Sequence, residues 1–249
     1  MEQKKAKHSK GYKSAIIRLL IFSICMIMMI ISGRHILKWA KENKRSKNIA
    51  ENIISSVKVE EDNNLIVDFN KLKEENSNTV AWLKVEGTNI EYPVVKAKDN
   101  EFYLTHSFDD KYNSAGWVFA DYKNTFDGTD KNIVIYGHNR RDGSMFGTLK
   151  RILDKDWYEN ENNKYVTLVT EYGNLKYEVF SVYKVKDEDY YTTNRFNSGD
   201  EFEELVKTVK KRSIHDFGND VERADKILTL STCADNNKYR VVLHAKKVQ

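Results

Sequence analysis

Residues 226–248 read KILTLSTCADNNKYRVVLHAKKV, which is two apolar runs joined by a short polar connection. The first run ends in Ser-Thr-Cys at Cys233, and the second opens at Arg240. Apolar runs bounded by Asn and Asp are typical of an antiparallel β-hairpin. We expect this hairpin to place Cys233 opposite Arg240, with Cβ atoms about 5 Å apart. The pattern therefore predicts a thiol at the tip of a strand and a guanidinium beside it.

Six further strand-like runs precede the hairpin and bring the total to eight. They lie between positions 81 and 185 and read AWLKV, IEYPVV, GWVFA, NIVIY, YVTLV and LKYEVFSVYKV. Short runs separated by Gly, Asn and Asp turns favour a barrel or a sandwich. Pro93 lies inside the second run and has no backbone N–H, so it indicates an edge or bulge position there. We therefore expect a mainly β body.

Apolar residues at helical spacing interrupt the β pattern. Residues 198–215, between the sixth and seventh runs, open with an S-x-x-E capping box at Ser198. Apolar residues then follow at i, i+3, i+4 and i+7, which predicts one amphipathic helix. They are Phe202, Leu205, Val206 and Val209. A shorter helix is expected from about Ser144, and two more are expected at residues 41–61 and 68–76.

The N-terminal region contains one segment that is suited to a membrane. Residues 15–32 read AIIRLLIFSICMIMMIIS, close to the roughly 20 residues that a helix needs to cross a bilayer. No small-x-small cleavage site follows, which favours an uncleaved signal anchor over a cleaved signal peptide or a buried core helix. The expected organisation is a basic cytoplasmic arm (1–14), a transmembrane anchor (15–33), a helical linker with N-terminal helices (34–78) and the β body (79–249).

Charge is divided unevenly along the chain. Positions 1–47 hold 12 of the 41 Lys/Arg residues and 2 of the 37 Asp/Glu residues, so this part is +10 and the remainder is −6. A body of that sign with no basic face gives little reason to expect nucleic-acid binding, whereas the basic tail suits an anionic membrane surface. Five lysines precede the apolar segment and Arg18 lies near its start, and six Lys/Arg residues follow it, so charge does not set its orientation. The short N-terminal arm cannot be the functional part, so a body that acts outside the cytoplasm would lie C-terminal to the membrane.

The chain has two cysteines, and only one of them belongs to the body. Cys25 lies within the apolar segment, so Cys233 has no intramolecular partner. A lone thiol in an exported domain is a buried small residue, half of an intermolecular disulfide, or a nucleophile. A guanidinium at Arg240 would favour the thiolate and could hold the oxyanion of an acyl intermediate, although it could also be a solvated charge at a strand end.

Two histidines are candidates for a base that serves this thiol. His138 ends the apolar run NIVIY in the sequence YGHN, much as Cys233 ends its own run. His244 competes with it, since it shares a strand face with Arg240. A positioned imidazole could take and return the proton as the thiol reacts, but a turn histidine with a structural hydrogen bond is also compatible with His138. His215, near the end of the amphipathic helix, suits a structural place at the negative end of the helix dipole.

Metal and cofactor motifs are missing from the sequence. It contains no HExxH, no CxxC and no glycine-rich phosphate loop. We therefore expect no metal and no other cofactor, and we expect the acidic stretch 186–190 to be a solvated loop.

Taken together, YGHN followed by RRDGSMFGTL, LTLSTC near the C-terminus, an arginine seven residues on, and the N-terminal anchor resemble a sortase, and class B in particular. The resemblance covers about residues 48–249. It implies an eight-stranded β-barrel with N-terminal helices and a long helix between strands six and seven. Sortases are surface transpeptidases of Gram-positive bacteria, so it also implies an extracytoplasmic body on a single-pass anchor in the cell membrane.

The resemblance also implies site residues and partners. His138 would be the general acid and base, Cys233 the nucleophile, and Arg240 the group that orients substrate and stabilises the oxyanion. Thr232 and Ser231 would line the substrate site, and His244 would no longer be the base. The substrates implied are surface proteins with a C-terminal sorting motif, and the acceptor is an amine of a peptidoglycan precursor or cell-wall peptide. A thiol protease, or a non-catalytic membrane-tethered module that binds the cell wall, are the alternatives.

Overall fold

The computed structural model describes residues 2–54, 57–59, 65–186, 188–234 and 239–249. The chain divides into two compact units, Met1–Arg45 and Ser46–Gln249. The first unit consists of most of α1 (Glu2–Ile54). Within Ser14–Ile53 this helix has an 18-residue window of mean hydropathy 2.5, none of it buried, so it is long and apolar enough to cross a membrane.

The helix predicted over residues 41–61 is shorter than expected. It is the end of α1 and stops at Ile54, and β1 (Val57–Val59) pairs with β2 (Leu65–Val67) in a two-stranded antiparallel sheet. The sequence VKV alternates β-branched and polar residues, which favours a strand over another helical turn. Residues 60–64 lie outside the described part of the chain. The helix predicted at 68–76 is confirmed as α2 (Phe69–Glu75), where Asp68 Oδ1 accepts from Lys71 N at 3.0 Å.

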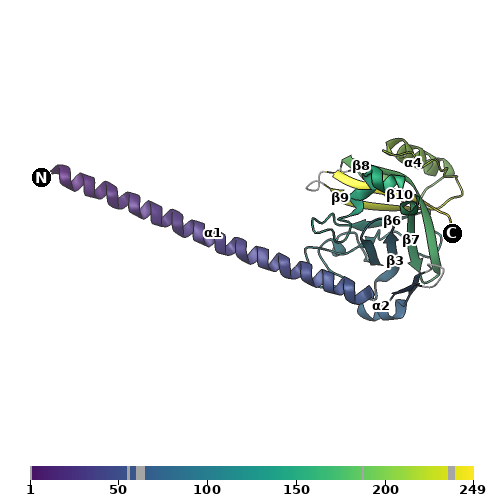
Figure 1. Ribbon diagram of the computed structural model, residues 1–249, viewed down its shortest axis with the longest axis horizontal. Helices are drawn as coiled ribbons and strands as arrows, with labels where there is room; N and C mark the ends of the chain where they lie inside the picture. Colours follow the sequence, from purple (N-terminus) through teal and green to yellow (C-terminus); the bar gives the residue numbers. More distant parts are fainter. Residues whose placement is uncertain (1, 55–56, 60–64, 187, 235–238) are drawn as a thin grey trace. The chain divides into compact units, whose positions relative to one another are not determined.

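The body is a closed barrel, and each of the eight runs predicted from the sequence overlaps one of its strands (Figure 1). The order around the barrel is β10-β8-β7-β3-β4-β5-β6-β9. Two neighbouring pairs are parallel, β4 with β5 and β6 with β9, and the other described pairs are antiparallel. The strands are β3 (Thr79–Val85), β4 (Ile90–Val95), β5 (Phe119–Ala120), β6 (Asn132–Gly137), β7 (Tyr165–Thr170), β8 (Gly173–Lys186), β9 (Ile227–Ala234) and β10 (Tyr239–Lys247).

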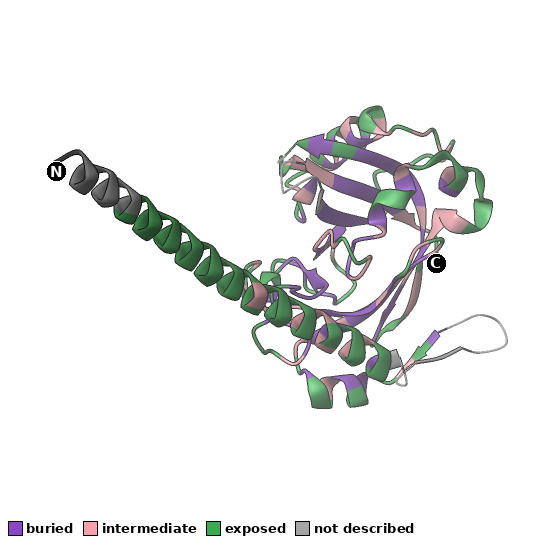
Figure 2. Cartoon of the chain, turned by 60° about the vertical axis from the view of Figure 1, so that its left-hand side comes forward, coloured by how far each residue is buried: buried purple, intermediate pink, exposed green. Residues whose placement is uncertain are grey.

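The barrel is filled by apolar side chains that alternate inward along its strands. Leu83, Leu168, Leu228 and Leu230 are among the members of this core that are fully buried. Figure 2 shows the same strands as largely buried. Pro93 was expected at an edge or bulge, but β4 lies between β3 and β5 in the closed barrel. Pro93 is paired with Trp82 of β3, and the described pairing of β4 with β5 is limited to Val95.

The long amphipathic helix is α4 (Gly199–Arg212), and its four predicted apolar residues are all buried. It lies between β8 and β9. β8 and β9 are the sixth and seventh strands of the barrel. The labels differ by two because β1 and β2 precede the barrel in the chain, so the helix does not lie between the strands labelled β6 and β7. The capping box differs in detail. Ser198 Oγ accepts from Glu201 N at 3.3 Å as predicted, but the Glu201 carboxylate accepts from Asn197 N at 2.8 Å.

The helix predicted near Ser144 is wrong at its start. The segment first makes a turn in which Met145 has a φ of 51°, and a 3₁₀ helix, η2 (Leu149–Leu153), follows. Two glycines favour that turn over a helix. Gly143 has a φ of +79°, which a residue with a side chain rarely adopts, and a Cβ at Gly147 would lie 2.3 Å from the Arg140 carbonyl oxygen. The remaining short elements are η1 (Phe102–Leu104), α3 (Lys155–Glu159), η3 (Glu161–Lys164) and η4 (Tyr190–Thr192).

Candidate active site

The parallel pair β6 and β9 brings two predicted site residues to one edge of the barrel. Gly137 of β6 is the register partner of Thr232 of β9. His138 directly follows Gly137, the last residue of β6, and Cys233 directly follows Thr232 near the end of β9, so the two residues lie at the same level of neighbouring strands. Adjacent strands in a sheet are about 4.8 Å apart. Two residues far apart in the sequence therefore meet at one end of the barrel.

The hairpin of β9 and β10 adds the third residue. Arg240 is the register partner of Cys233, so the register predicted from the sequence is confirmed. Opposed residues of an antiparallel pair have Cα atoms about 4.5–5.5 Å apart. Arg240 is half-buried, and residues 235–238 of the connection lie outside the described part of the chain. The ends of β6 and β9 and the start of β10 thus gather His138, Cys233 and Arg240.

The His138 ring is held by a backbone carbonyl from the short helix η1. Its Nε2 lies 2.8 Å from the Leu104 carbonyl oxygen. A carbonyl only accepts hydrogen bonds, so Nε2 carries the proton in this contact, and in the neutral ring Nδ1 is left as the acceptor. The contact fixes the orientation of the imidazole, which is half-buried. No pattern in the sequence indicates this contact, because a backbone carbonyl has no side-chain signature.

Gly116 closes the space behind this ring. Its φ is +60°, and a Cβ placed there would lie 2.5 Å from the Tyr103 carbonyl oxygen, 2.9 Å from that of Leu104 and 2.8 Å from His138 Cδ2. A residue with a side chain would therefore be both strained in its backbone and in collision with the group that holds the imidazole. Gly116 is a site-supporting residue that the sequence reasoning missed, because it was read only as the start of the run GWVFA.

The loop after His138 folds back on the histidine. Phe146 N donates to the His138 carbonyl at 3.0 Å, and Asn139 forms an isolated bridge with Met145. The Phe146 ring packs so closely on Gly137 that a Cβ there would lie 2.7 Å from it. The glycine of YGHN therefore permits the close approach of the Phe146 ring.

The two residues predicted to line the substrate site are almost wholly buried. Ser231 is 1% exposed and its Oγ lies 2.9 Å from the hydroxyl of Tyr191 in η4, while Thr232 is 2% exposed. Ser231 therefore joins β9 to the start of the long connection between β8 and β9.

His244 is occupied on both ring nitrogens. It is 0% exposed, its Nε2 lies 2.9 Å from the Tyr183 hydroxyl, and its Nδ1 lies 2.9 Å from Thr229 Oγ1. Burial lowers the pKa of His244 to about 3, so the ring is neutral at physiological pH. It is a structural residue of the interior, and it is not available as a base to a substrate at the surface.

A chain of hydrogen bonds continues from His244 in both directions. Tyr190 donates to Tyr183 at 3.0 Å, and Thr229 Oγ1 donates to Asn132 Oδ1 at 2.8 Å. Asn132 Nδ2 in turn donates to the Thr193 carbonyl at 2.9 Å. These bonds tie η4 and the residues after it to β6, β9 and β10, and so fix the beginning of the β8–β9 connection beside the strands that carry the site.

The other histidines of the body have structural contacts. His215 Nε2 lies 3.2 Å from the Leu153 carbonyl and its ring stacks on Tyr158, so its contacts are structural as predicted, but it lies beyond the end of α4 at Arg212 and not in the last turn of the helix. His106 Nδ1 lies 2.8 Å from the Phe102 carbonyl. Among the residues whose side chains the structure describes, no three His, Cys, Asp or Glu are grouped so as to hold a metal ion.

Comparison with known proteins gives these features a family. The Sortase domain family matches residues 83–248. Sortase B of Listeria monocytogenes is 37% identical over 185 residues, which are 73% of this chain and 74% of that protein. The structure of a Staphylococcus aureus sortase B–substrate complex is similar with a TM-score of 0.68 and 31% identity, over 73% of this chain and 84% of that one. A sortase B complexed with triglycine is similar with a TM-score of 0.68 and 32% identity, over 73% of this chain and 86% of that one. The chain belongs to the sortase B family.

Proposed function

We propose that this cysteine transpeptidase uses Cys233 as nucleophile, His138 as general acid and base, and Arg240 to stabilise the oxyanion, with Ser231 and Thr232 next to the bound substrate. The observation that supports the proposal is the register that gathers the ends of β6 and β9 and the start of β10. A thiol can serve as the nucleophile of acyl transfer through a thioester, an imidazole as its acid and base, and a guanidinium as a donor to the oxyanion.

The reaction then divides into two balanced steps. The Cys233 thiolate attacks the carbonyl carbon of a threonine in a C-terminal sorting motif, and Arg240 holds the negative charge that develops on the carbonyl oxygen. The peptide C–N bond breaks as imidazolium His138 gives a proton to the departing amine, which leaves a thioester. An incoming amine attacks the thioester, neutral His138 takes its proton, and the thiolate is released. The product has a new amide bond in place of the old one.

The substrates we propose are surface proteins that carry the sorting motif, and an amine of a peptidoglycan precursor or cell-wall peptide. One S. aureus sortase B structure holds a substrate, and a sortase B structure is complexed with triglycine, a peptide with a free amine. An amine acceptor separates this proposal from that of a thiol protease, which would pass the acyl group to water. Transfer to an amine also distinguishes the proposed transpeptidase from a non-catalytic wall-binding module, which would transfer the acyl group neither to an amine nor to water.

The decisive experiment uses the purified full chain, a set of sorting-motif peptides and triglycine, with products identified by mass spectrometry. We expect ligated product from wild type and no cleavage from Cys233→Ala. Cys25→Ala is the matched control, since Cys25 is exposed on the apolar helix and should be dispensable. Arg240→Ala should lower kcat by about 10²–10³. Cleavage by Cys233→Ala would refute the assignment, and hydrolysis without ligation at saturating triglycine would favour the protease.

We also propose that α1 anchors the chain in the cell membrane by a single pass, with a basic cytoplasmic arm and the body outside the cytoplasm. The apolar window of α1 is wholly unburied, which an aqueous setting disfavours and a bilayer favours. Protease added to intact Gram-positive cells should digest the body and spare the arm. Protection of the body would overturn this orientation.

A further inference from the structure

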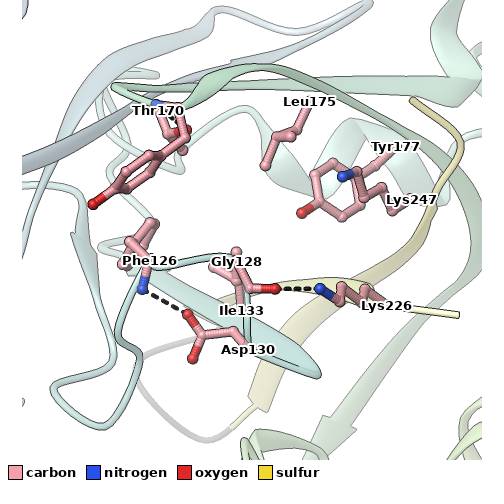
Figure 3. A pocket seen from close by; sticks show the side chains of 10 residues that line it. Phe126, Gly128, Asp130, Ile133, Thr170, Leu175, Tyr177, Lys226 and Lys247 are labelled. Atoms are coloured by element: carbon pink, nitrogen blue, oxygen red, sulfur yellow. Dashed lines mark hydrogen bonds between the residues drawn. The ribbon is translucent and has the colours of Figure 1, made fainter. Parts of the chain in front are cut away.

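A pocket of about 190 Å³ opens at the end of the barrel opposite the candidate active site (Figure 3). Three of its residues place it there: Ile133 near the start of β6, Lys226 just before β9, and Lys247 at the end of β10. The candidate catalytic residues lie at the opposite ends of the same three strands. The pocket is therefore a separate feature of the barrel.

The floor of the pocket is apolar. Phe126 and Ile133 are each 7% exposed and belong to the barrel core, and Leu175 packs against that core from β8. A cavity of about 150 Å³ with such a lining is large enough to hold benzene. The volume and lining of this pocket thus suit one aromatic ring or a short aliphatic chain.

Tyr177 supplies a polar group in this apolar setting. Its side chain is 2% exposed, and Figure 3 shows its hydroxyl directed into the pocket. No described residue forms a hydrogen bond with that hydroxyl. Burial raises the pKa of Tyr177, with a smaller contribution from the charge of Asp130, so the hydroxyl remains a proton donor. The hydroxyl opens onto the pocket without a described protein partner, so it can donate to an acceptor of a bound molecule.

The pocket also has an excess of positive charge. Lys226 donates to the Gly128 carbonyl, and among the described ion pairs neither Lys226 nor Lys247 has a carboxylate partner. Asp130 is the one acidic residue of the lining, and its carboxylate already accepts from Phe126 N at 2.7 Å and Thr125 N at 3.0 Å. The Lys247 ammonium, the other N–H groups of the Lys226 ammonium and the Tyr177 hydroxyl can therefore donate to an anion, and the two lysines outnumber Asp130 in charge.

We propose that this pocket binds a small carboxylate whose apolar body is about the size of one aromatic ring. The ring would lie on Phe126, Ile133 and Leu175. The carboxylate would accept from the Tyr177 hydroxyl and from the ammonium groups of Lys226 and Lys247, and hydrogen bonds of this charged kind are stronger than neutral ones.

The test uses the full chain in lipid nanodiscs, with phenylacetate as probe and binding followed by saturation-transfer NMR, after subtraction of the signal from empty nanodiscs. We expect saturable binding of phenylacetate and at least about tenfold weaker binding of the neutral analogue 2-phenylethanol. Lys226→Gln combined with Lys247→Gln should weaken phenylacetate binding by about tenfold or more. Lys207→Gln, on the exposed face of α4, is the matched control and should have no effect.

Tyr177→Phe removes only the hydroxyl and keeps the ring in the core, so it should fold normally and bind phenylacetate severalfold more weakly. Cys233→Ala should bind like wild type, which makes the result independent of the proposed catalytic residues. The proposal is overturned if phenylacetate fails to saturate, if 2-phenylethanol binds equally well, or if the lysine and tyrosine variants bind like Lys207→Gln.

Discussion

Replacing Gly116 with alanine would test how the barrel holds His138. The new Cβ would lie 2.5 Å from the Tyr103 carbonyl oxygen, whereas ordinary contacts begin at 3.4 Å, so the backbone of η1 has to move away by nearly 1 Å. The Leu104 carbonyl that accepts from His138 Nε2 belongs to the same short helix. The imidazole would therefore be displaced by a change that removes none of its own atoms.

Two contributions set the size of the effect. An alanine at a φ of +60° destabilises the folded chain by about 1–2 kcal/mol, and overpacking adds about 1–3 kcal/mol. For catalysis, a misplacement of about 1 Å in a positioned group lowers the rate by about 10²-fold. We therefore expect Gly116→Ala to lower kcat for sorting-peptide cleavage by about 100-fold. The assay is run at a temperature where the variant stays folded, so that its lower unfolding free energy does not account for the loss of activity.

Gly218→Ala is the matched control. Gly218 has a φ of +69° and a Cβ there would have no atom within 4 Å, so the backbone strain is similar and the collision is absent. This variant should lose about 1–2 kcal/mol in urea unfolding and retain its kcat. Both variants are measured for unfolding free energy and for peptide cleavage at a fixed temperature. Equal kcat values for the two alanine variants would refute the reasoning that Gly116 positions His138.

Three further outcomes concern stability. Burial lowers the pKa of His244 to about 3 from an ordinary 6.5, so as the pH falls the unfolded chain binds a proton at a higher pH than the folded chain does. The contribution of neutral His244 to the unfolding free energy is therefore fully present above pH 6.5. It should then fall by up to about 1.4 kcal/mol per pH unit toward pH 3, and His244→Gln should have a shallower decline in urea unfolding. Asn76→Ala should lower the unfolding free energy by about 2–4 kcal/mol because the buried amide donates to the Phe108 carbonyl at 2.6 Å, whereas the exposed Asn162→Ala should have little effect. Ser198→Ala should destabilise the chain by about 1 kcal/mol through loss of the α4 cap, seen as a lower Tm, and an unchanged Tm would show that the cap is dispensable.

The eight barrel strands could be located from the sequence because each overlaps a β-branched or aromatic run with turn residues on both sides, whereas β1 and β2 were not predicted. The same local information determined the register of Cys233 and Arg240, since a short connection leaves a hairpin few ways to pair. The helix expected near Ser144 was wrong because buried residues at Met145, Leu149 and Ile152 have helical spacing. They are buried from a turn and a 3₁₀ helix instead. The spacing of apolar residues predicts which residues are buried, but here it did not predict the type of backbone element that buries them.

The support of the site could not be predicted in the same way. His138 Nε2 meets the Leu104 carbonyl across 34 positions of sequence, and Gly116 is required there only because three atoms from other segments surround it. Such contacts arise from the closed barrel and leave no local pattern. The roles of His138, Cys233 and Arg240 stay predictions until the variants are assayed, but their common position on three strand ends is now established.

The parallel pairing of β6 with β9 bears on the stage of folding at which the candidate site forms. Parallel neighbours need a long crossover, and here the crossover contains β7, β8 and α4 between Gly137 and its partner Thr232. Because closing so long a loop costs entropy, we expect the β6–β9 contacts to form late in folding, and His138 and Cys233 to become neighbours only when the barrel closes. A variant that weakens barrel closure should lose cleavage activity together with its cooperative unfolding transition, even when every residue of the candidate site is unchanged.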